Sequence, residues 1–363
     1  MKIALLLSGG VDSSVSLRLL QEQGHDVTAF YVKIWLEDEL KYLGDCPWEE
    51  DLKYARAVCD QAGVRLQIMS LQKEYRKEVV AYTLRELKAG RTPNPDVLCN
   101  QRIKFGQFHK KIDKSFEKVA TGHYAQVVAR NSKLVTCNLL KRSPDPVKDQ
   151  TYFLCHLSQK QVSRALFPIG HLTKSEVRKL AQKFDLPNKN RKDSQGICFL
   201  GQVRFSEFVQ HHLGEKKGDL IEIETGKKVG EHNGYWYFTI GQRQGIGLSG
   251  GPWYVVKKNV RKNVVYVTRG RSSDERRVTS NEMQVTSDEF KIHSINWIAR
   301  RLPKKREVTV RIRHGGELLP GRLTLHRDGS GTVRLKKAAT GVAPGQFAAL
   351  YDGKYCLGGG VIA

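Results

Sequence analysis

The sequence predicts an α/β protein: a doubly wound parallel sheet followed by two small β-rich domains, the last of them a β-barrel. Two observations lead to this fold class. Strand and helix patterns alternate over roughly the first third of the chain, which is typical of parallel βαβ units. From about Gly218 onward, glycines become frequent and the strand-like segments short, which is typical of small antiparallel barrels or sandwiches.

The amino-terminal elements begin with an apolar run, residues 2–7, that predicts a buried strand. Gly9 and Gly10 form a turn, and residues 11–23 repeat apolar side chains at helical spacing. The following elements are strands at 26–34, 65–70 and 118–122 and helices at 51–62 and 74–89. In such sheets a ligand binds at the carboxyl ends of the strands.

The β-rich half contains nine expected strands. They are placed at residues 220–224, 235–239, 253–257, 264–268, 292–299, 307–314, 321–326, 331–335 and 346–351. A polar run, residues 271–281, is expected to link two units. We therefore expect domains at 1–205, 206–280 and 281–363, of which the central one would contribute to RNA binding.

The charge of the chain is strongly basic, with a formal net charge of +24 at pH 7. Residues 257–337 hold 21 Lys and Arg against 8 Asp and Glu, so +13 of that charge falls there. A local excess of this kind indicates a surface for phosphates, with nucleic acid the first candidate and an acidic membrane the second. A generally basic surface kept for solubility is the alternative.

Other broad classes are disfavoured by the composition. No run reaches the ~18 apolar residues that span a bilayer, and residues 1–7 lack the layout of a signal peptide. We expect a cytoplasmic protein, or a chloroplast or mitochondrial one if the numbering starts after a transit peptide. The seven cysteines contain no C-x-x-C pair, which disfavours a disulfide framework or a structural zinc site.

The sharpest local motif is Ser8-Gly9-Gly10-Val11-Asp12-Ser13-Ser14, between the first strand and the first helix. The glycines allow a tight turn close to a ligand, and the helix start offers free N–H groups and a positive dipole end. The serine hydroxyls complete a cradle for phosphate. Asp12 would repel phosphates unless a metal ion lies between them, and Mg²⁺ is the natural candidate. A bare glycine pair before a helix is otherwise only a turn.

This string resembles the PP-loop of ATP pyrophosphatases. The resemblance implies that ATP is cleaved between its α- and β-phosphates, that a carbonyl-type oxygen is adenylated, and that pyrophosphate is released. The superfamily includes amide-forming synthetases, lysidine synthetases and RNA thiolases, so the loop alone does not choose among them.

Four further strings follow in order along the chain: Asn94–Asn100, Thr121–Tyr124, Lys148–Phe153 and Asp193–Phe199. Behind a PP-loop, they resemble the bacterial and organellar tRNA 2-thiouridylase family. Additional matching strings are Tyr237–Gly245, Pro344–Gln346 and Cys356–Gly360. The resemblance covers nearly the whole chain.

The family resemblance implies two sulfur-handling cysteines. Cys198 would carry a persulfide, and Cys99 would be its partner and close a disulfide with it, with Asp96 beside Cys99 as a third catalytic residue. This fits thiol chemistry, since one thiol holds the outer sulfur and a second assists its release. Alternatively, both are small buried residues, the ordinary state of an intracellular cysteine. For the other five cysteines we prefer that interpretation.

The resemblance also implies ligand contacts. The ATP contacts are Leu7, Ser8, Gly9, Gly10, Val11, Asp12, Ser13, Val32 and Gly122, with Asp12 as the metal ligand. The tRNA contacts are Asn94, Pro95, Asp96, His123, Lys148, Asp149, Gln150, Arg313, His314 and Gln346. The alternatives are an Asx turn at Asn94-Pro95, a satisfied histidine at His123 and a solvated turn at 148–150.

The chain departs from the family pattern at a few positions. Leu6-Leu7 stand where the family usually has Gly-Met, Val32 where it commonly has methionine, and His314 where it has tyrosine. The apolar character is kept at the first two places. Residues 37–50 do not match the family closely.

The expected function is ATP-dependent thiolation of the wobble uridine in the anticodon arm of tRNA. The implied partners are tRNA and a persulfide donor such as a cysteine desulfurase or sulfur carrier, with ATP and Mg²⁺ as cofactors and no membrane. Two alternatives remain open at this point. One is another PP-loop amidating or lysidine-type ligase, which needs no thiol. The other is an RNA-binding protein with an inactive nucleotide fold.

Overall fold

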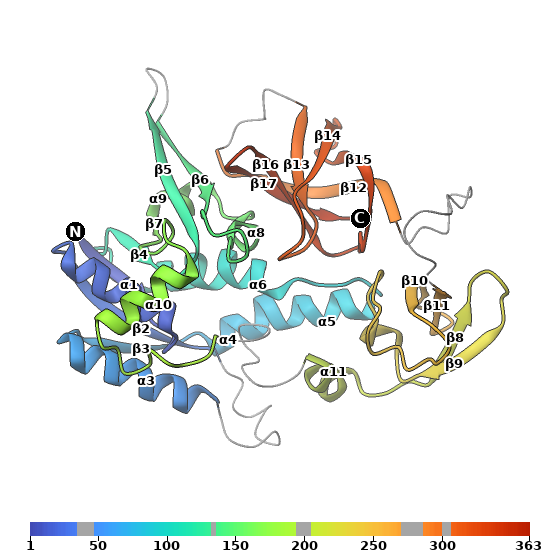
Figure 1. The fold of residues 1–363 in the computed structure, drawn as a ribbon, viewed down its shortest axis with the longest axis horizontal. Coiled ribbons are helices and arrows are strands. Elements are labelled where there is room, and N and C mark those ends of the chain that lie inside the picture. The colour runs from blue at the N-terminus through green and yellow to red at the C-terminus, as the bar shows by residue number, and fades with distance from the viewer. Residues whose placement is uncertain (35–46, 132–135, 194–204, 270–285, 300–305) are drawn as a thin grey trace.

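A five-stranded parallel sheet forms the centre of the amino-terminal domain (Figure 1). The structure is a computed structural model that describes residues 1–34, 47–131, 136–193, 205–269, 286–299 and 306–363. The sheet order is β3-β2-β1-β4-β7, with every neighbouring pair parallel. The strands are β1 (Lys2–Leu6), β2 (Asp26–Lys33), β3 (Leu66–Ser70), β4 (Lys118–Ala120) and β7 (Ala165–Leu166).

Helices cover both faces of this sheet, which confirms the doubly wound class. Along β1, Ile3 and Leu5 face a core shared with α1, whereas Ala4 faces the core on the opposite side. The helices are α1 (Val11–Glu22), α3 (Pro47–Ala62), α4 (Gln72–Tyr75), the π-helix η2 (Arg76–Val80), α5 (Ala81–Lys88), α6 (Pro95–Leu98), the π-helix η3 (Cys99–Gln107), α7 (Phe108–Lys111), α8 (Thr151–Leu154), α9 (Gln159–Arg164), α10 (Lys174–Lys183) and α11 (Phe205–Leu213).

Several helix starts are specified by local sequence. Thr173 and Glu176 form a capping box at α10, in which each side chain bonds the other's backbone N–H. Asn94 caps α6, and Pro95 occupies the first helical position, where its missing N–H costs nothing. The starts of the helices that line the candidate site are therefore well defined.

A small four-stranded sheet forms the centre of the middle domain, in the order β10-β11-β8-β9. Its strands are β8 (Gly218–Glu222), β9 (Lys228–His232), β10 (Trp253–Asn259) and β11 (Val264–Arg269). The strand expected at 235–239 is wrong, because Tyr235–Tyr237 form a 3₁₀ turn. The Tyr235 hydroxyl there donates to the carbonyl oxygen of Lys88, so the aromatic run packs on the first domain instead of joining the sheet.

The last domain is a closed six-stranded antiparallel barrel, as the sequence predicts. β12 pairs with both β15 and β17, which closes the order β12-β15-β14-β13-β16-β17. The strands are β12 (Thr286–Trp297), β13 (Glu307–Arg311), β14 (Leu319–Leu325), β15 (Gly331–Thr340), β16 (Phe347–Asp352) and β17 (Tyr355–Ile362).

One hairpin of the first domain joins the barrel sheet. Strands β5 (Ala125–Asn131) and β6 (Thr136–Arg142) pair with each other, and β6 also pairs with β17 through Leu140 and Cys356. In Figure 1 this hairpin rises from the first domain beside the barrel. The first and last domains are thus joined by backbone hydrogen bonds as well as by side-chain packing. Within the described residues, no helix combines the length and the apolar character needed to cross a membrane.

Candidate active site

The Ser8–Ser14 loop connects the carboxyl end of β1 to the start of α1. Gly9 has a φ of 76°, and a Cβ atom on it would lie 2.2 Å from the carbonyl oxygen of Asp51, so only glycine fits. The Ser13 hydroxyl donates to the Gly10 carbonyl at 2.9 Å, and the Ser8 and Ser13 hydroxyls lie 3.3 Å apart. The loop has the geometry of a helix-terminal phosphate cradle.

Two residues from the loop that follows α10 hold the cradle in place. The buried Asn188 side chain donates to the Gly9 carbonyl at 2.7 Å and to the Ser14 hydroxyl at 2.9 Å. Arg191 donates to the same Gly9 carbonyl at 3.2 Å and to Asp51 Oδ1 at 2.6 Å. The direction of the Gly9 peptide is therefore set by groups about 180 residues away in sequence.

Asp12 lies in the first turn of α1, and its carboxylate is already paired. Its Oδ1 accepts from the Tyr124 hydroxyl at 2.9 Å and from Lys174 Nζ at 2.7 Å. Burial, and secondarily the charge of Asp12, raise the pKa of the Tyr124 hydroxyl. Lys174 thus places a positive charge beside the phosphate cradle.

Lys174 continues into a chain of ion pairs. Its Nζ also lies 2.8 Å from Asp193, which in turn pairs with Lys148 at 2.7 Å and Arg178 at 2.5 Å. Burial opposes ionisation of Asp193, but the hydrogen bonds from Lys148 and Lys174 outweigh it and hold its pKa well below the ordinary value. In this chain of ion pairs, three cations therefore pair with two carboxylates.

Gly122 lies against the first turn of α1, at the end of β4. A Cβ atom there would approach the Ser13 nitrogen to 2.7 Å, so glycine permits this contact. The neighbouring His123 bonds Thr121 at 2.7 Å and stacks edge-on against Phe167. Burial is the main reason that the pKa of His123 falls well below 6.5, so its imidazole is neutral near pH 7.

The other expected ATP contacts line the apolar side of this edge. Leu7 is buried in the core beneath the loop, as is Val11. Val32 is the register partner of Met69 on β3, and both are partly buried beside Leu6. A methionine is therefore present next to the position where the family pattern has one.

A metal ion fits this site only together with a nucleotide. Among the described residues, no group of three or more His, Cys, Asp or Glu side chains is arranged to hold a metal. Mg²⁺ is commonly held by one or two carboxylates plus substrate phosphates and water. The Asp12 carboxylate, about a third exposed, suits that arrangement.

Asn94, Pro95, Asp96 and Cys99 lie on one helical segment made of α6 and η3. Cys99 is the first residue of the π-helix η3 and is 1% exposed. Single stretches of π-helix occur frequently at functional sites. The Asn94 side chain caps α6 by accepting from the Val97 N–H at 3.3 Å.

A bridging segment connects this helix to the nucleotide loop. The Gln150 side chain accepts from the Tyr124 backbone N–H at 3.0 Å, and the hydroxyl of the same tyrosine donates to Asp12. Two residues later, the Tyr152 hydroxyl accepts from Asn94 Nδ2 at 3.4 Å, and the Phe153 carbonyl accepts from Asn100 at 3.3 Å. The structure thus brings the expected ATP and uridine contacts into one connected network.

Within the 148–150 loop, the three residues have different surroundings. Lys148 is partly exposed and pairs with Asp193. Asp149 is 1% exposed, and its carboxylate bonds Arg142 Nε at 2.7 Å and Arg311 Nη1 at 3.0 Å. The Asp149 side chain therefore orders the loop from inside and does not offer its carboxylate to RNA.

The barrel contributes the remaining expected RNA contacts. Arg313 and His314 are exposed at the end of β13, and the His314 ring lies 4.3 Å from that of Phe153. Partial desolvation of its ring, and then the charge of Arg311, lower the pKa of His314. Gln346 does not project freely, because its amide bonds residues 92–94. Cys198 and Cys46 lie outside the described residues, as does the expected linker at 271–281.

Sequence reasoning missed Lys174, Arg191 and Asn188 at the nucleotide loop and Tyr152 and Arg311 at the domain junction. A weak signal existed for Lys174, since it follows the cap Thr173 of a clear helix start. The others act through long-range contacts that no local pattern reveals.

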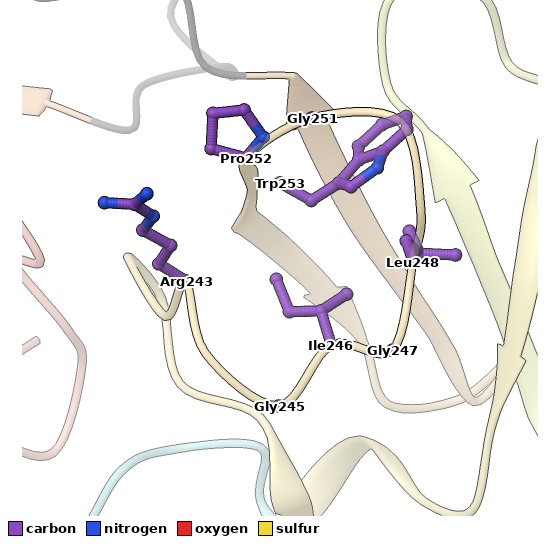
Figure 2. Close-up of a pocket in the computed structure, with 8 residues that line it drawn as sticks. All are labelled: Arg243, Gly245, Ile246, Gly247, Leu248, Gly251, Pro252 and Trp253. Carbon is purple, nitrogen blue, oxygen red and sulfur yellow. The ribbon is translucent and has the colours of Figure 1, made fainter.

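The middle domain has an open hollow formed by its glycine-rich loop. Figure 2 shows Arg243 on one side and Ile246, Leu248 and Trp253 on the other. Gly245 and Gly247 adopt positive φ values of 74° and 78°, which lets the loop curl around the hollow. Trp253 is held by its indole N–H on the Ser249 carbonyl, and Arg269 lies over its ring at 4.8 Å.

The doubly wound sheet with a Ser-Gly-Gly loop at the carboxyl end of its first strand defines an ATP-using enzyme of the PP-loop type. Family models match three consecutive parts of the chain. They are described as a tRNA methyl transferase HUP domain at residues 1–202, a tRNA methyl transferase PRC-barrel domain at 206–269 and an aminomethyltransferase beta-barrel domain at 287–362.

Curated relatives match over the full length. The chain is 45% identical to tRNA-specific 2-thiouridylase MnmA 1 of Bacteroides thetaiotaomicron, covering 100% of this chain and 99% of the relative. It is 44% identical to MnmA of Parabacteroides distasonis and 43% identical to that of Porphyromonas gingivalis, each with 100% and 99% coverage. The chain belongs to the tRNA-specific 2-thiouridylase family.

Proposed function

We propose that this protein is a tRNA 2-thiouridylase that replaces the C2 oxygen of the wobble uridine with sulfur at the expense of ATP. The observation that carries the proposal is the continuous network from Asp12 through Tyr124 and Gln150 to Tyr152 and Asn94. It links the expected phosphate cradle to the cap of a cysteine-bearing helix, and a ligase that transfers an amine has no need of the thiol.

In the first step, the uridine oxygen attacks the α-phosphorus of ATP and pyrophosphate leaves. The Ser8–Ser13 loop binds the phosphates through its N–H and hydroxyl groups, and Lys174 and Arg191 supply positive charge at its edge. Asp12 would hold Mg²⁺, which neutralises phosphate charge when bound. The result is an adenylated uridine with AMP as the leaving group.

In the second step, the outer sulfur of a persulfide on Cys198 attacks C2 and AMP departs with the original oxygen. The Cys99 thiolate then attacks the inner sulfur, so a Cys99–Cys198 disulfide forms and the new sulfur stays on the base. An external thiol reductant resets the pair. The persulfide comes from a cysteine desulfurase or a sulfur-carrier protein. Asp96, on the same helix, is assigned to orient the uridine or hold a proton near Cys99.

The basic barrel and the middle domain are proposed to hold the anticodon arm through its phosphates, with salt-sensitive affinity. Arg313, exposed at the end of β13, suits a phosphate fork, and the exposed His314 ring suits stacking. Domain limits near residues 205 and 280 and a cytoplasmic location belong to this proposal.

The decisive experiment is thionucleoside analysis of tRNA after incubation with ATP, Mg²⁺ and a persulfide source. We expect 2-thiouridine with the wild type and none with Cys198→Ser. Cys137→Ser, which changes a partly buried cysteine outside the site, is the matched control and should retain full activity. Equal product from wild type and Cys198→Ser would remove Cys198 from the mechanism. No product from the wild type despite a confirmed sulfur supply would overturn the function.

A further inference from the structure

Gln346 belongs to the barrel, directly before β16, yet its amide group contacts the first domain. Its Nε2 donates to the carbonyl oxygens of Thr92 at 3.2 Å and Pro93 at 3.1 Å. Its Oε1 accepts from Asn94 Nδ2 at 3.3 Å and from the Tyr152 hydroxyl at 3.3 Å. Both amide hydrogens are thereby donated to carbonyl oxygens, and the single hydroxyl hydrogen of Tyr152 is shared between Gln346 Oε1 and the Phe347 carbonyl oxygen at 3.2 Å.

The backbone around Gln346 closes on the same part of the first domain. The Thr92 N–H donates to the Pro344 carbonyl at 2.8 Å. Gly345 has a φ of 90°, and a Cβ atom on it would lie 2.9 Å from both Arg91 Cβ and the Thr92 carbonyl oxygen. The barrel therefore contacts residues 91–94, directly before α6, through a main-chain turn as well as through one side chain.

Asn94, which Gln346 holds, is in turn the cap of the helical segment that carries Cys99. Asn94 gives its Nδ2 group to Gln346 and Tyr152, so its Oδ1 is directed toward the Val97 N–H as the cap of α6. Pro95 starts the helix with a fixed φ. Asp96 follows within this first turn, and Cys99 begins the next.

We propose that Gln346 is a positioning residue for the Cys99 segment, defined here as residues 92–99. The barrel sets the cap of the helix, and through that cap the placement of Asp96 and Cys99. The consequence for catalysis rests on the proposed function, but the positioning is a property of the protein without RNA. Donation of a hydrogen bond from the Gln346 amide to RNA, one form of the contact that the family resemblance implies, would compete with the bonds that it already donates to Thr92 and Pro93.

The test measures amide hydrogen exchange by mass spectrometry in protein without tRNA or ATP. Gln346→Met keeps the side-chain length and removes every hydrogen bond of the amide. We expect exchange in peptides covering residues 92–100 to become about tenfold faster, the effect of losing one or two ordinary hydrogen bonds, with no change in α1. Asn296→Ala is the control, since Asn296 also joins the barrel to the first domain, through the carbonyls of Cys155 and Leu157. It should leave exchange in residues 92–100 at the wild-type level.

A second readout separates positioning from RNA contact. Gln346→Met should lower the single-turnover thiolation rate with unchanged affinity for tRNA. Unchanged exchange together with weakened tRNA binding would overturn the inference and make Gln346 an RNA contact only. If Gln346→Met does not fold, Gln346→Glu, which loses the two donors and keeps an acceptor, should show the same acceleration. If the wild type makes no thiolated product, the proposed function fails, and the exchange result still decides the positioning role.

Discussion

The nucleotide loop and the Cys99 segment differ in where their support comes from. Around Ser8–Ser14, the hydroxyl hydrogen bonds run to Gly10 within the loop itself, and the outer contacts come from Asn188 and Arg191 of the same domain. Residues 92–99 instead depend on Gln346, which lies about 250 residues further along the chain in the barrel. The expected phosphate contacts therefore belong to a loop held within one domain, whereas the segment that carries Asp96 and Cys99 is also held by the barrel.

This difference suggests how adenylation and sulfur transfer are coupled. In the proposed reaction, RNA that binds the barrel also contacts the domain that holds the Cys99 segment, whereas all the expected ATP contacts lie in the first domain. Substitutions at the domain junction should accordingly disturb the thiol chemistry and spare nucleotide binding.

The largest effect is expected from Arg311→Met. Asp149 is buried between Arg142 and Arg311. Removal of Arg311 leaves the buried carboxylate with one of these two positive charges to balance it. Breaking such a buried pair costs about 3–5 kcal/mol of unfolding free energy. Denaturant unfolding should show this loss, while ATP affinity at a temperature where the variant is folded should be unchanged.

The matched control for this test is Arg334→Met, which breaks an exposed pair with Glu289 on the same barrel. An exposed pair contributes about 0–1 kcal/mol. If Arg311→Met cost no more than Arg334→Met, the buried ion cluster would not be what fastens the barrel to the first domain. If it weakened ATP binding, the separation between the two sites would be wrong.

The second effect concerns acid pH and His156, whose ring packs edge-on against Phe347 at 4.8 Å. Burial lowers the pKa of His156 from 6.5 to about 4. As the pH falls, His156 therefore takes up a proton in the unfolded chain at a higher pH than it does in the folded protein. The stability contribution is complete above pH 6.5 and is lost between pH 6.5 and about 4, by up to about 3 kcal/mol.

Unfolding free energies of wild type and His156→Leu, measured between pH 7.5 and 4.5, check this assignment. The variant should lose less stability on acidification, and the difference between the two slopes isolates His156 from the other histidines. Phe347, which packs against His156, directly follows Gln346, so protonation of His156 should also weaken the support of residues 92–99. In the wild type, hydrogen exchange in residues 92–99 should therefore become faster relative to exchange in α1 when the pH is lowered. Parallel slopes for the two proteins would assign the acid sensitivity elsewhere.

The same difference between local and long-range support explains which features the sequence could predict. The Ser8–Ser14 loop was predictable because its glycines, serines and helix start act on neighbours within five residues. The barrel was predictable as a class from short strands. Its last strand, β17, was not expected, because Gly358–Gly360 resemble a loop in sequence. In the structure these glycines allow close packing, and a Cβ on Gly358 would lie 1.9 Å from the Asn296 carbonyl oxygen.

The roles assigned by motif alone were less informative where long-range contacts dominate. The family resemblance implies RNA contacts for both Asp149 and Gln346. In the structure, both side chains instead form hydrogen bonds at the junction between the first domain and the barrel. The hairpin β5–β6 was missed for a similar reason, since its outer partner, β17, comes from the end of the chain. No local periodicity encodes these partners.

The smallest effect, and the one that examines the nucleotide side of the comparison, is expected from Lys174→Met. Lys174 joins Asp12 to Asp193 beside the phosphate cradle. Without it, two carboxylates face the phosphates with less compensation, and ATP should bind about tenfold more weakly, or about 1.4 kcal/mol. Calorimetric titration with ATP and Mg²⁺ measures this directly. Lys179→Met, an exposed lysine on the same helix, is the control and should bind as the wild type does.

The Lys174 variant should leave hydrogen exchange in residues 92–99 unchanged, because its partners Asp12 and Asp193 are not among the residues that hold Asn94. A rise in exchange there would show that the ion-pair chain through Asp193 reaches the Cys99 segment, and the two sites would then be coupled within the protein before RNA binds. Unchanged ATP affinity would limit Lys174 to neutralising Asp12 and Asp193, and would leave Arg191 and the helix terminus as the phosphate-binding groups.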